Sequence, residues 1–483
     1  MKGTYRNVLG ILLILAGCFT AGVVHARQDL PEVRSTLQDQ KQVAVTIYND
    51  NLALVRDLRR IALPKGESLL ALREVSGGMM PETALLQASG DGKTLQVIEQ
   101  SFDFDLLTPA KLLEKYVGRS VEVVRVHPQT GAESREQAEV LAANGGVVLR
   151  MGDRIETGVP GRLVFPAVPE NLRDRPTLVV QLASDRAGER ELELSYLTTG
   201  LSWEADYVAE LNPADDRLDL YGWVTLSNQS GAEFRDARLQ LVAGNVHRVA
   251  GPPVMDFEAR SMMAMAEAPK MAEETLLDYH LYTLDRPTTI RQNQVKQVAL
   301  LTAAGVPAAK EYVLRGGEYY YRGRHGDLGE KLHPAVYLEF NNREKSGLGV
   351  PLPKGVIRVY KQDSRGNAQF VGEDRIEHTA KNEAVRLRLG EAFDVNARRV
   401  QTDYKKLAGG EKETLIESAY RIELKNAKSE PVTVIVEEPM PGDWQIVQEN
   451  LPHEKKNART AVWKIRVPAE GEAQLTYRTR VKY

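Results

Sequence analysis

The alternation of apolar and polar residues in short runs is the feature that most constrains this sequence. Successive side chains of a β-strand point to opposite faces, so a run in which every second residue is apolar indicates a strand with one buried face. Such runs recur from residue 43 to the end of the chain, with polar turn residues between them, and they predict a mainly β protein. The clearest runs are Val43–Ile47, Val121–Val123, Leu192–Leu194 and Leu239–Leu241.

The C-terminal segment 412–483 carries four such runs in succession. Regular short strands separated by polar turns are typical of a β-sandwich, so we expect an immunoglobulin-like module here. Trp463 shares one face of its run with Ile465 and Val467, which predicts a buried indole ring. The four runs are Ile422–Leu424, Val432–Val436, Trp463–Val467 and Ala473–Tyr477.

A chain of 483 residues is too long for one compact core, so the strands must be divided among several domains. The expected fold class is mainly β, with several antiparallel β-sandwich-like domains, one or two short helices, and the C-terminal immunoglobulin-like module. The expected divisions are an N-terminal β domain over 40–190, a central β domain built from 191–250 and 276–405, a flexible insertion over 251–275, and the C-terminal sandwich over 412–483.

One short helix is predicted near 109–117. Thr108 suits the N-cap, Pro109 suits the first helical position, and Gly118 ends the pattern. The apolar residues between them have helical spacing, so we expect Tyr116 to pack in a core and not to contact a ligand.

The N-terminus resembles an export signal. Lys2 and Arg6 precede the apolar run 8–15, as in a bacterial leader peptide. Two cleavage sites are open: a cut before Cys18, in a lipobox-like run, gives a lipid-anchored protein, and a cut after Ala26 gives a soluble one. We expect the mature chain to be periplasmic or associated with the outer membrane. The leader is then residues 1–26, or 1–17 in a lipoprotein.

Charge and cysteine content limit the partners. The net charge of −3 argues against a nucleic acid, which requires a basic surface. Cys18 is the only cysteine, so no disulfide forms within the chain. After the leader no apolar run reaches the ~18 residues of a membrane-spanning helix, and a lipid on Cys18 is the one membrane attachment that we expect. The expected partner is an envelope protein or a glycan.

Motifs that would assign a reaction are missing from the sequence. It contains no G-x-S-x-G nucleophile elbow and no H-E-x-x-H zinc helix. Gly92-Lys93-Thr94 resembles the end of a phosphate loop, but the position of the leading glycine is Gln87. The histidines outside the leader are scattered singly, which predicts no local metal site. We therefore assign no catalytic, cofactor-binding or metal-binding residue and expect no cofactor.

The segment 251–275 interrupts the alternation and contains Met262, Met263, Met265 and Met271. Thioether sulfurs suit Cu(I), which is one interpretation of this composition. No histidine lies nearby and only two of the methionines are adjacent, so we favour a flexible loop.

Residues that are distant in the sequence could also come together in the fold to form a ligand-binding site. The residues that we would place in contact with a ligand are Trp203, Trp223, Tyr320 and His378. Each also has a structural interpretation: Tyr320 belongs to the glycine- and charge-rich stretch Arg315–Leu328, which we expect at a hairpin tip or exposed loop. The alternation around His378 is typical of a structural histidine at a strand end.

Two positions predict local packing. Gly222 precedes Trp223 in a strand pattern, and glycine there permits a bulge or close packing beneath a large ring. Phe393 is expected in a core.

Six phrases spread along the chain occur in a fixed order: Tyr196–Trp203, Gly222–Gly231, Leu241–Val246, Tyr279–Tyr282, Leu352–Tyr360 and Gly390–Val395. In order and spacing they resemble the domain-of-unknown-function family 4139, over a stretch from about Val43 to the C-terminus. The phrase from Val45 to Arg56 is similar to the N-terminal β-region that accompanies this domain, including in mucoidy-inhibitor-like proteins. The resemblance implies an exported, strand-rich protein and carries over no catalytic residues.

Two functions are compatible with these observations. The first is an exported cell-envelope β-protein that acts without catalysis as a scaffold, binding or assembly protein. The alternative is a carbohydrate-binding or hydrolytic envelope enzyme with a site assembled from distant loops. A deep pocket that gathers histidine, acids and aromatic residues would favour the second function, and exposed sheet edges would favour the first.

Overall fold

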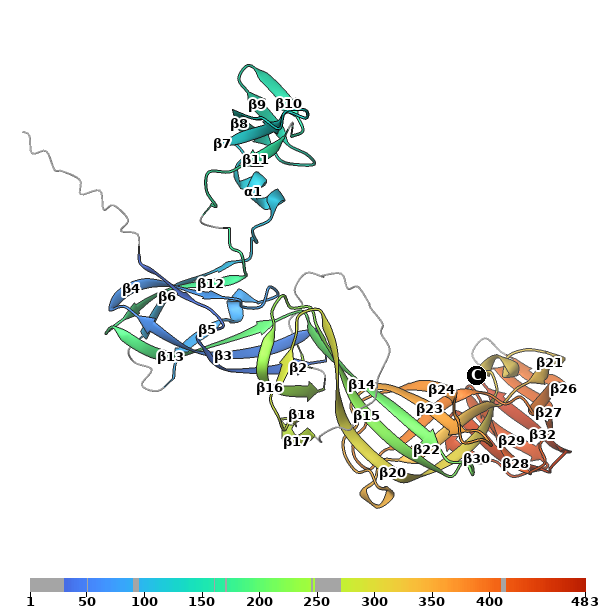
Figure 1. Ribbon diagram of the computed structural model, residues 1–483. Helices are drawn as coiled ribbons and strands as arrows, with labels where there is room; N and C mark the ends of the chain where they lie inside the picture. Colours follow the sequence, from blue (N-terminus) through green and yellow to red (C-terminus); the bar gives the residue numbers. More distant parts are fainter. Residues whose placement is uncertain are drawn as a thin grey trace, which may run out of the picture.

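The structure is a computed structural model that describes residues 30–49, 51–89, 95–159, 161–169, 172–244, 246–247, 271–409 and 414–483. The predicted leader with Cys18, and residues 251–270 of the expected insertion, lie outside the described residues. The described chain is mainly β, as the alternation predicts, and its sheets pack as sandwiches. Figure 1 shows an elongated arrangement, with a small lobe branching from the N-terminal half.

Two sheets share the N-terminal part of one large core. Apolar residues at alternate positions fill the space between them: Val43, Val45 and Ile47 are all buried on β2. The four-stranded sheet has the order β1 (Glu32–Ser35), β4 (Gly66–Arg73), β12 (Thr177–Ser184) and β6 (Leu95–Asp103). The eight-stranded sheet has the order β17 (Met271–Leu276), β18 (Tyr279–Leu284), β16 (Phe234–Ala243), β2 (Gln40–Tyr48), β3 (Leu52–Leu63), β13 (Gly188–Thr198) and β5 (Leu85–Ala88), with β19 (Thr288–Ile290) beside β16.

The expected insertion 251–275 ends earlier than the sequence suggests. Met271 begins strand β17, which pairs with β18 in antiparallel register from Met271 opposite Leu284 to Leu276 opposite Tyr279. Residues 271–275 are therefore part of a sheet and not of a loop.

A long strand, β20 (Gln294–Arg315), joins the central and C-terminal parts of the chain. Its first half pairs with β15 (Arg217–Asn228), and its second half pairs with β22 (Ala335–Asn341) and, in parallel, with β28 (Val432–Pro439). The sheet that it organises has the order β24 (Ala368–Ile376), β23 (Gly355–Gln362), β14 (Leu201–Leu211), β15 (Arg217–Asn228), β20, β28 (Val432–Pro439), β31 (Thr460–Val467) and β30 (Glu454–Asn457), and β22 (Ala335–Asn341) also pairs with β25 (Ala384–Glu391).

The C-terminal sandwich draws on more of the chain than 412–483. Its second core includes Tyr312, Tyr321 and Val395 from upstream segments, and Trp463 lies fully buried in it, as the alternation predicts. The sheet that faces β28 and β31 has the order β21 (Asp327–Leu332), β26 (Val395–Gly409), β27 (Thr414–Asn426), β32 (Gly471–Lys482) and β29 (Asp443–Glu449).

The branching lobe contains the described α-helix, α1 (Pro109–Lys115), and a five-stranded sheet with a core of its own. The Thr108 hydroxyl accepts a hydrogen bond of 3.2 Å from the backbone N–H of Lys111, which is the predicted N-cap. Tyr116 is 4% exposed and packs in the lobe core, as expected. The sheet has the order β10 (Arg154–Thr157), β9 (Val148–Met151), β8 (Glu133–Ala142), β7 (Ser120–Val126) and β11 (Arg162–Val164).

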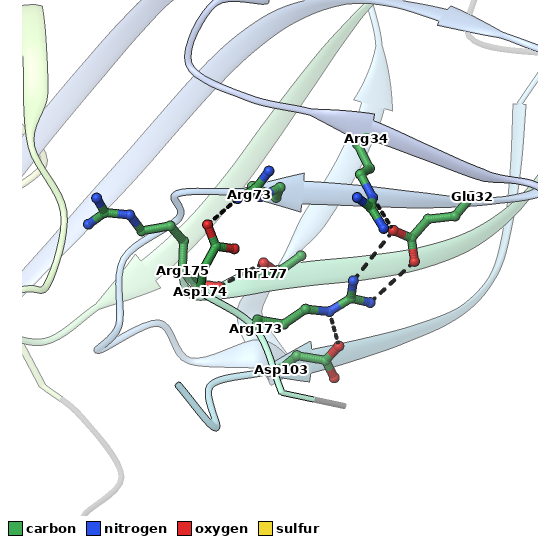
Figure 2. Close-up of polar contacts among 8 residues, drawn as sticks. All are labelled: Glu32, Arg34, Arg73, Asp103, Arg173, Asp174, Arg175 and Thr177. Atoms are coloured by element: carbon green, nitrogen blue, oxygen red, sulfur yellow. Dashed lines mark hydrogen bonds and ion pairs between the residues drawn. The ribbon is translucent and has the colours of Figure 1, made fainter. Parts of the chain in front are cut away.

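Ion pairs fasten the base of the lobe to the four-stranded sheet. Figure 2 shows Arg173, on the returning connection, between Asp103 at the end of β6 and Glu32 on β1. The distances are 3.0 Å to Asp103 and 3.3 Å to Glu32. Arg73 pairs with Asp174 beside them. The two connections therefore meet in charged contacts, while the lobe core and the sandwich core remain separate clusters.

The packing around Gly222 agrees with the prediction, whereas the position of Phe393 contradicts it. A Cβ atom added at Gly222 would lie 3.2 Å from the Tyr207 ring, and the strand register shifts between Gly222 and Trp223. Both the close packing beneath a ring and the bulge are therefore present. The prediction for Phe393 is wrong: the side chain is 90% exposed, because the chain turns between β25 and β26 at this point.

Candidate ligand pocket

A cavity of about 630 Å³ lies where the central and C-terminal sheets meet. Its lining comes from β20, β22, β25, β28, β30 and β31 of the ten-stranded sheet, from β21 and β26 of the five-stranded sheet, and from Tyr320 and His333 between strands. Pockets of this size hold small molecules. The walls belong to paired strands, so the cavity is formed without a bound ligand.

The charged lining of the pocket is mostly cationic. Two carboxylates, Glu391 and Glu437, face six basic side chains across it. The basic residues are Arg315, Lys331, Arg386, Arg388, Arg399 and Lys456.

Four of these cations have a carboxylate partner. Arg386 lies 2.9 Å from Glu311, Arg388 lies 3.6 Å from Glu391, Lys456 lies 2.6 Å from Glu437, and Arg399 lies 2.7 Å from Glu438. Among the residues that the structure describes, Arg315 and Lys331 form no ion pair. The lining thus has two solvent-exposed cations that no carboxylate of the described chain pairs.

A buried polar network lies behind the pocket wall. Arg399 and Glu438 are 1% and 0% exposed, and the Tyr321 hydroxyl donates a hydrogen bond of 2.9 Å to the same carboxylate. Tyr477 lies 2.9 Å from the Tyr321 hydroxyl and extends the network. Burial raises the pKa of Glu438, and Arg399 opposes that rise. The same burial raises the pKa of Tyr321 and Tyr477 well above the usual range, so both stay protonated donors.

Tyr320 links this network to the cavity. It lines the pocket, and its hydroxyl accepts a hydrogen bond of 3.3 Å from Arg399. The Arg399 guanidinium also lies 5.2 Å from the centre of the Tyr320 ring, a cation–π distance. Tyr420 donates a hydrogen bond of 2.7 Å to the Tyr320 carbonyl. Tyr320 is therefore held by Arg399 at its side chain and by Tyr420 at its backbone.

The segment 319–321 differs from the expected hairpin tip. Glu318–Tyr321 forms a short 3-10 helix in which Tyr320 and Tyr321 are buried, and only Tyr319 is exposed. The expectation of an exposed loop is wrong here because a 3-10 turn directs consecutive side chains to different sides, and two of them enter the C-terminal core.

The other three predicted contacts lie away from the pocket. Trp203 is 1% exposed in the large core, and Trp223 is half-buried on β15. His378 follows the end of β24, and its Nδ1 accepts a hydrogen bond of 3.2 Å from the backbone N–H of Lys354. The structure brings only Tyr320 to the cavity, so the four residues do not form one site.

Sequence reasoning missed the charged half of the site, although a signal was present. Arg399 follows Val395 and Ala397 at alternate positions of β26, and Glu438 follows Val434 and Val436 in the same way on β28. A charged residue on the inward face of a strand must find a partner, because an unpaired buried charge is costly. Both positions therefore mark a buried pair in facing sheets.

No group of three or more His, Cys, Asp or Glu side chains in the described part of the chain could hold a metal ion. Within the same residues, no helix is long and apolar enough to cross a membrane.

Comparison with known proteins identifies a family for most of the chain. The family model described as a domain of unknown function, DUF4139, matches residues 192–483. This range holds the long strand β20, the pocket and the C-terminal sandwich. A search of curated proteins finds no match.

Proposed function

We propose that this chain, which belongs to the DUF4139 family, is an exported binding protein of the cell envelope that holds a small ligand in the pocket beside Tyr320. The observation that carries the proposal is the preformed cavity of about 630 Å³ between two sheets of the matched region. The basic N-terminal residues and the apolar run after them support export.

The state of the acidic residues in the lining favours binding over catalysis. Glu391 lies 3.6 Å from Arg388 and Glu437 lies 2.6 Å from Lys456, so both carboxylates of the lining are engaged by protein cations. A catalytic carboxyl group must instead reach the reacting atoms of the ligand. We therefore propose that the ligand leaves the pocket chemically unchanged.

The test of binding is native mass spectrometry of protein purified from envelope extracts. We expect a co-purifying small molecule that is lost when Ala335→Trp fills the pocket from strand β22. The matched control is Ala309→Trp, on the neighbouring strand β20 but outside the lining, which should retain the molecule. Equal retention by both variants would contradict the proposal, and recovery of a cleaved ligand would favour the hydrolytic alternative.

Export has its own test. The intact mass of the mature protein distinguishes a chain that starts at acylated Cys18 from one that starts at Arg27. Retention of Met1 in the native protein would contradict export.

A further inference from the structure

We propose that the pocket recognises a hydroxylated dianion, such as a sugar phosphate or a sugar dicarboxylate. This inference rests on the proposed binding function and names the class of ligand. It follows from the balance of charge in the lining and from the polar groups that remain there without a protein partner.

The number of unpaired cations in the lining indicates how many negative charges the ligand carries. The carboxylates of Glu311, Glu391, Glu437 and Glu438 neutralise four of the six lining cations, which leaves Arg315 and Lys331. A ligand with two negative charges would balance this remainder. Arginine and lysine side chains are also the groups that proteins use to hold phosphate and carboxylate oxygens.

The uncharged lining supplies partners for hydroxyl groups. His333 lines the cavity, and its Nδ1 donates a hydrogen bond of 2.8 Å to the Ala392 carbonyl, which can only accept. Thr460 and Asn457 also line the cavity. Asn457 uses its Oδ1 to accept a hydrogen bond from the Arg459 backbone, and its NH₂ group stays available as a donor. Polar side chains of this kind can pair with hydroxyl groups, which both donate and accept.

The experiment titrates the mature protein by calorimetry near pH 8 with four probes. Glucose 1-phosphate and glucarate carry hydroxyl groups and two charges, glucose carries hydroxyl groups alone, and inorganic phosphate carries charge alone. We expect one or both hydroxylated dianions to bind at least about tenfold more tightly than glucose or phosphate. Binding of glucose 1-phosphate alone would indicate a phosphoryl ligand, and binding of both would indicate that two charges suffice.

The variant that tests the charge argument is Arg315→Gln/Lys331→Gln. It should weaken binding of the preferred dianion by about tenfold or more and reduce the salt dependence of its affinity. The control is Arg324→Gln/Lys464→Gln, which changes the net charge equally at two residues outside the pocket lining and should have little effect. An equal loss in both variants would overturn the assignment of the dianion to this pocket.

Two results would overturn the ligand class while leaving the pocket its function. One is tight binding of glucose that Ala335→Trp abolishes, and the other is a neutral molecule co-purifying in the same pocket. Binding of phosphate as tight as that of the sugar phosphate would overturn the hydroxyl half of the inference. Failure of both dianions at millimolar concentration would overturn the whole of it.

Discussion

Arg399 on β26 donates a hydrogen bond of 2.7 Å to Glu438 on β28, and solvent reaches neither side chain. The pair thereby joins the two sheets of the C-terminal sandwich through their shared core. A buried ion pair is stable only while both charges are present, because each desolvated charge depends on the other. The wall of the pocket therefore depends on a contact that no ligand needs to touch.

Removal of one partner should be costly. Arg399→Met leaves an uncompensated carboxylate at Glu438 and should lower the free energy of unfolding by about 3–5 kcal/mol, measured in urea. Arg399→Met/Glu438→Leu, with apolar side chains at both positions, should recover most of that loss. Lys464→Met removes a cation from the exposed pair with Glu454 and should change stability by less than about 1 kcal/mol. A loss in the double variant as large as in Arg399→Met would contradict this account.

The loss in Arg399→Met should depend on pH. The pKa of Glu438 in the folded protein is raised above the usual 4.5 of a glutamate, so the folded state holds this proton more tightly than the unfolded state. The contribution of Glu438 to the free energy of unfolding therefore falls as the pH rises from 4.5 through the pKa of Glu438 in the folded protein. Without the guanidinium the pKa rises further, so the variant should lose less stability near pH 5 than near pH 8. Glu438→Gln, added to Arg399→Met, should remove this pH dependence.

Asp215 gives the opposite dependence. Burial would raise its pKa, but ion pairs with Lys310 on β20 and Lys361 on β23 outweigh that effect and lower it. The lowered pKa means that charged Asp215 stabilises the fold at pH values above 3.8, the pKa of an aspartate in the unfolded chain. This stabilisation is lost as the pH falls through the lower pKa of Asp215 in the folded protein. Asp215→Asn should cost about 1 kcal/mol near pH 7 and nothing near pH 2, because asparagine also tolerates the left-handed backbone at φ 60°. A cost that persists at low pH would show that packing, not charge, is lost.

Gly222 should not accept a side chain. A Cβ atom there would lie 2.9 Å from Leu301 and 3.2 Å from the Tyr207 ring, so Gly222→Val should lower stability by about 1–3 kcal/mol through overpacking. Gly326→Val is the control, because its Cβ would meet no atom within 4 Å. Thermal unfolding of both variants measures the difference, and an unchanged melting temperature in Gly222→Val would contradict the packing.

The lobe should loosen at its base without unfolding. Arg173→Ala removes the ion pairs to Asp103 and Glu32, while the lobe keeps its own core. Limited proteolysis should then cut the connections 104–108 and 165–176 faster, and the released lobe should keep a dispersed amide spectrum. Arg34→Ala also removes a cation from Glu32 but leaves the Arg173–Asp103 pair intact, so it should have the smaller effect. Loss of dispersion on release would show that the lobe depends on the sheet.

Alternation in the sequence was enough to predict the strands and many of their inward faces. Val43, Trp463 and Tyr116 are buried as their spacing predicts. Pairing between strands that are distant in the sequence could not be predicted in this way, because a period of two fixes the face of a strand and not its neighbour. The burial of Tyr320 could not be predicted for a related reason: three consecutive tyrosines have no period, and only the 3-10 turn decides which rings enter the core. The prediction that Phe393 lies in a core was wrong because the exposure of a side chain at a turn depends on the direction of the chain there.

The 22 residues of β20 also govern how this protein can reach its fold. Its last residues, Tyr312–Arg315, pair in parallel with Val434–Glu437, more than a hundred residues further along the chain. During synthesis β20 can pair with β15 and β22 soon after they have emerged, while its parallel pairing with β28 must wait for nearly the whole chain. Closure of so long a loop is slow and leaves strand edges unpaired meanwhile. The C-terminal half should thus complete its folding only after translation ends, and residues 412–483 expressed alone should give a random-coil spectrum.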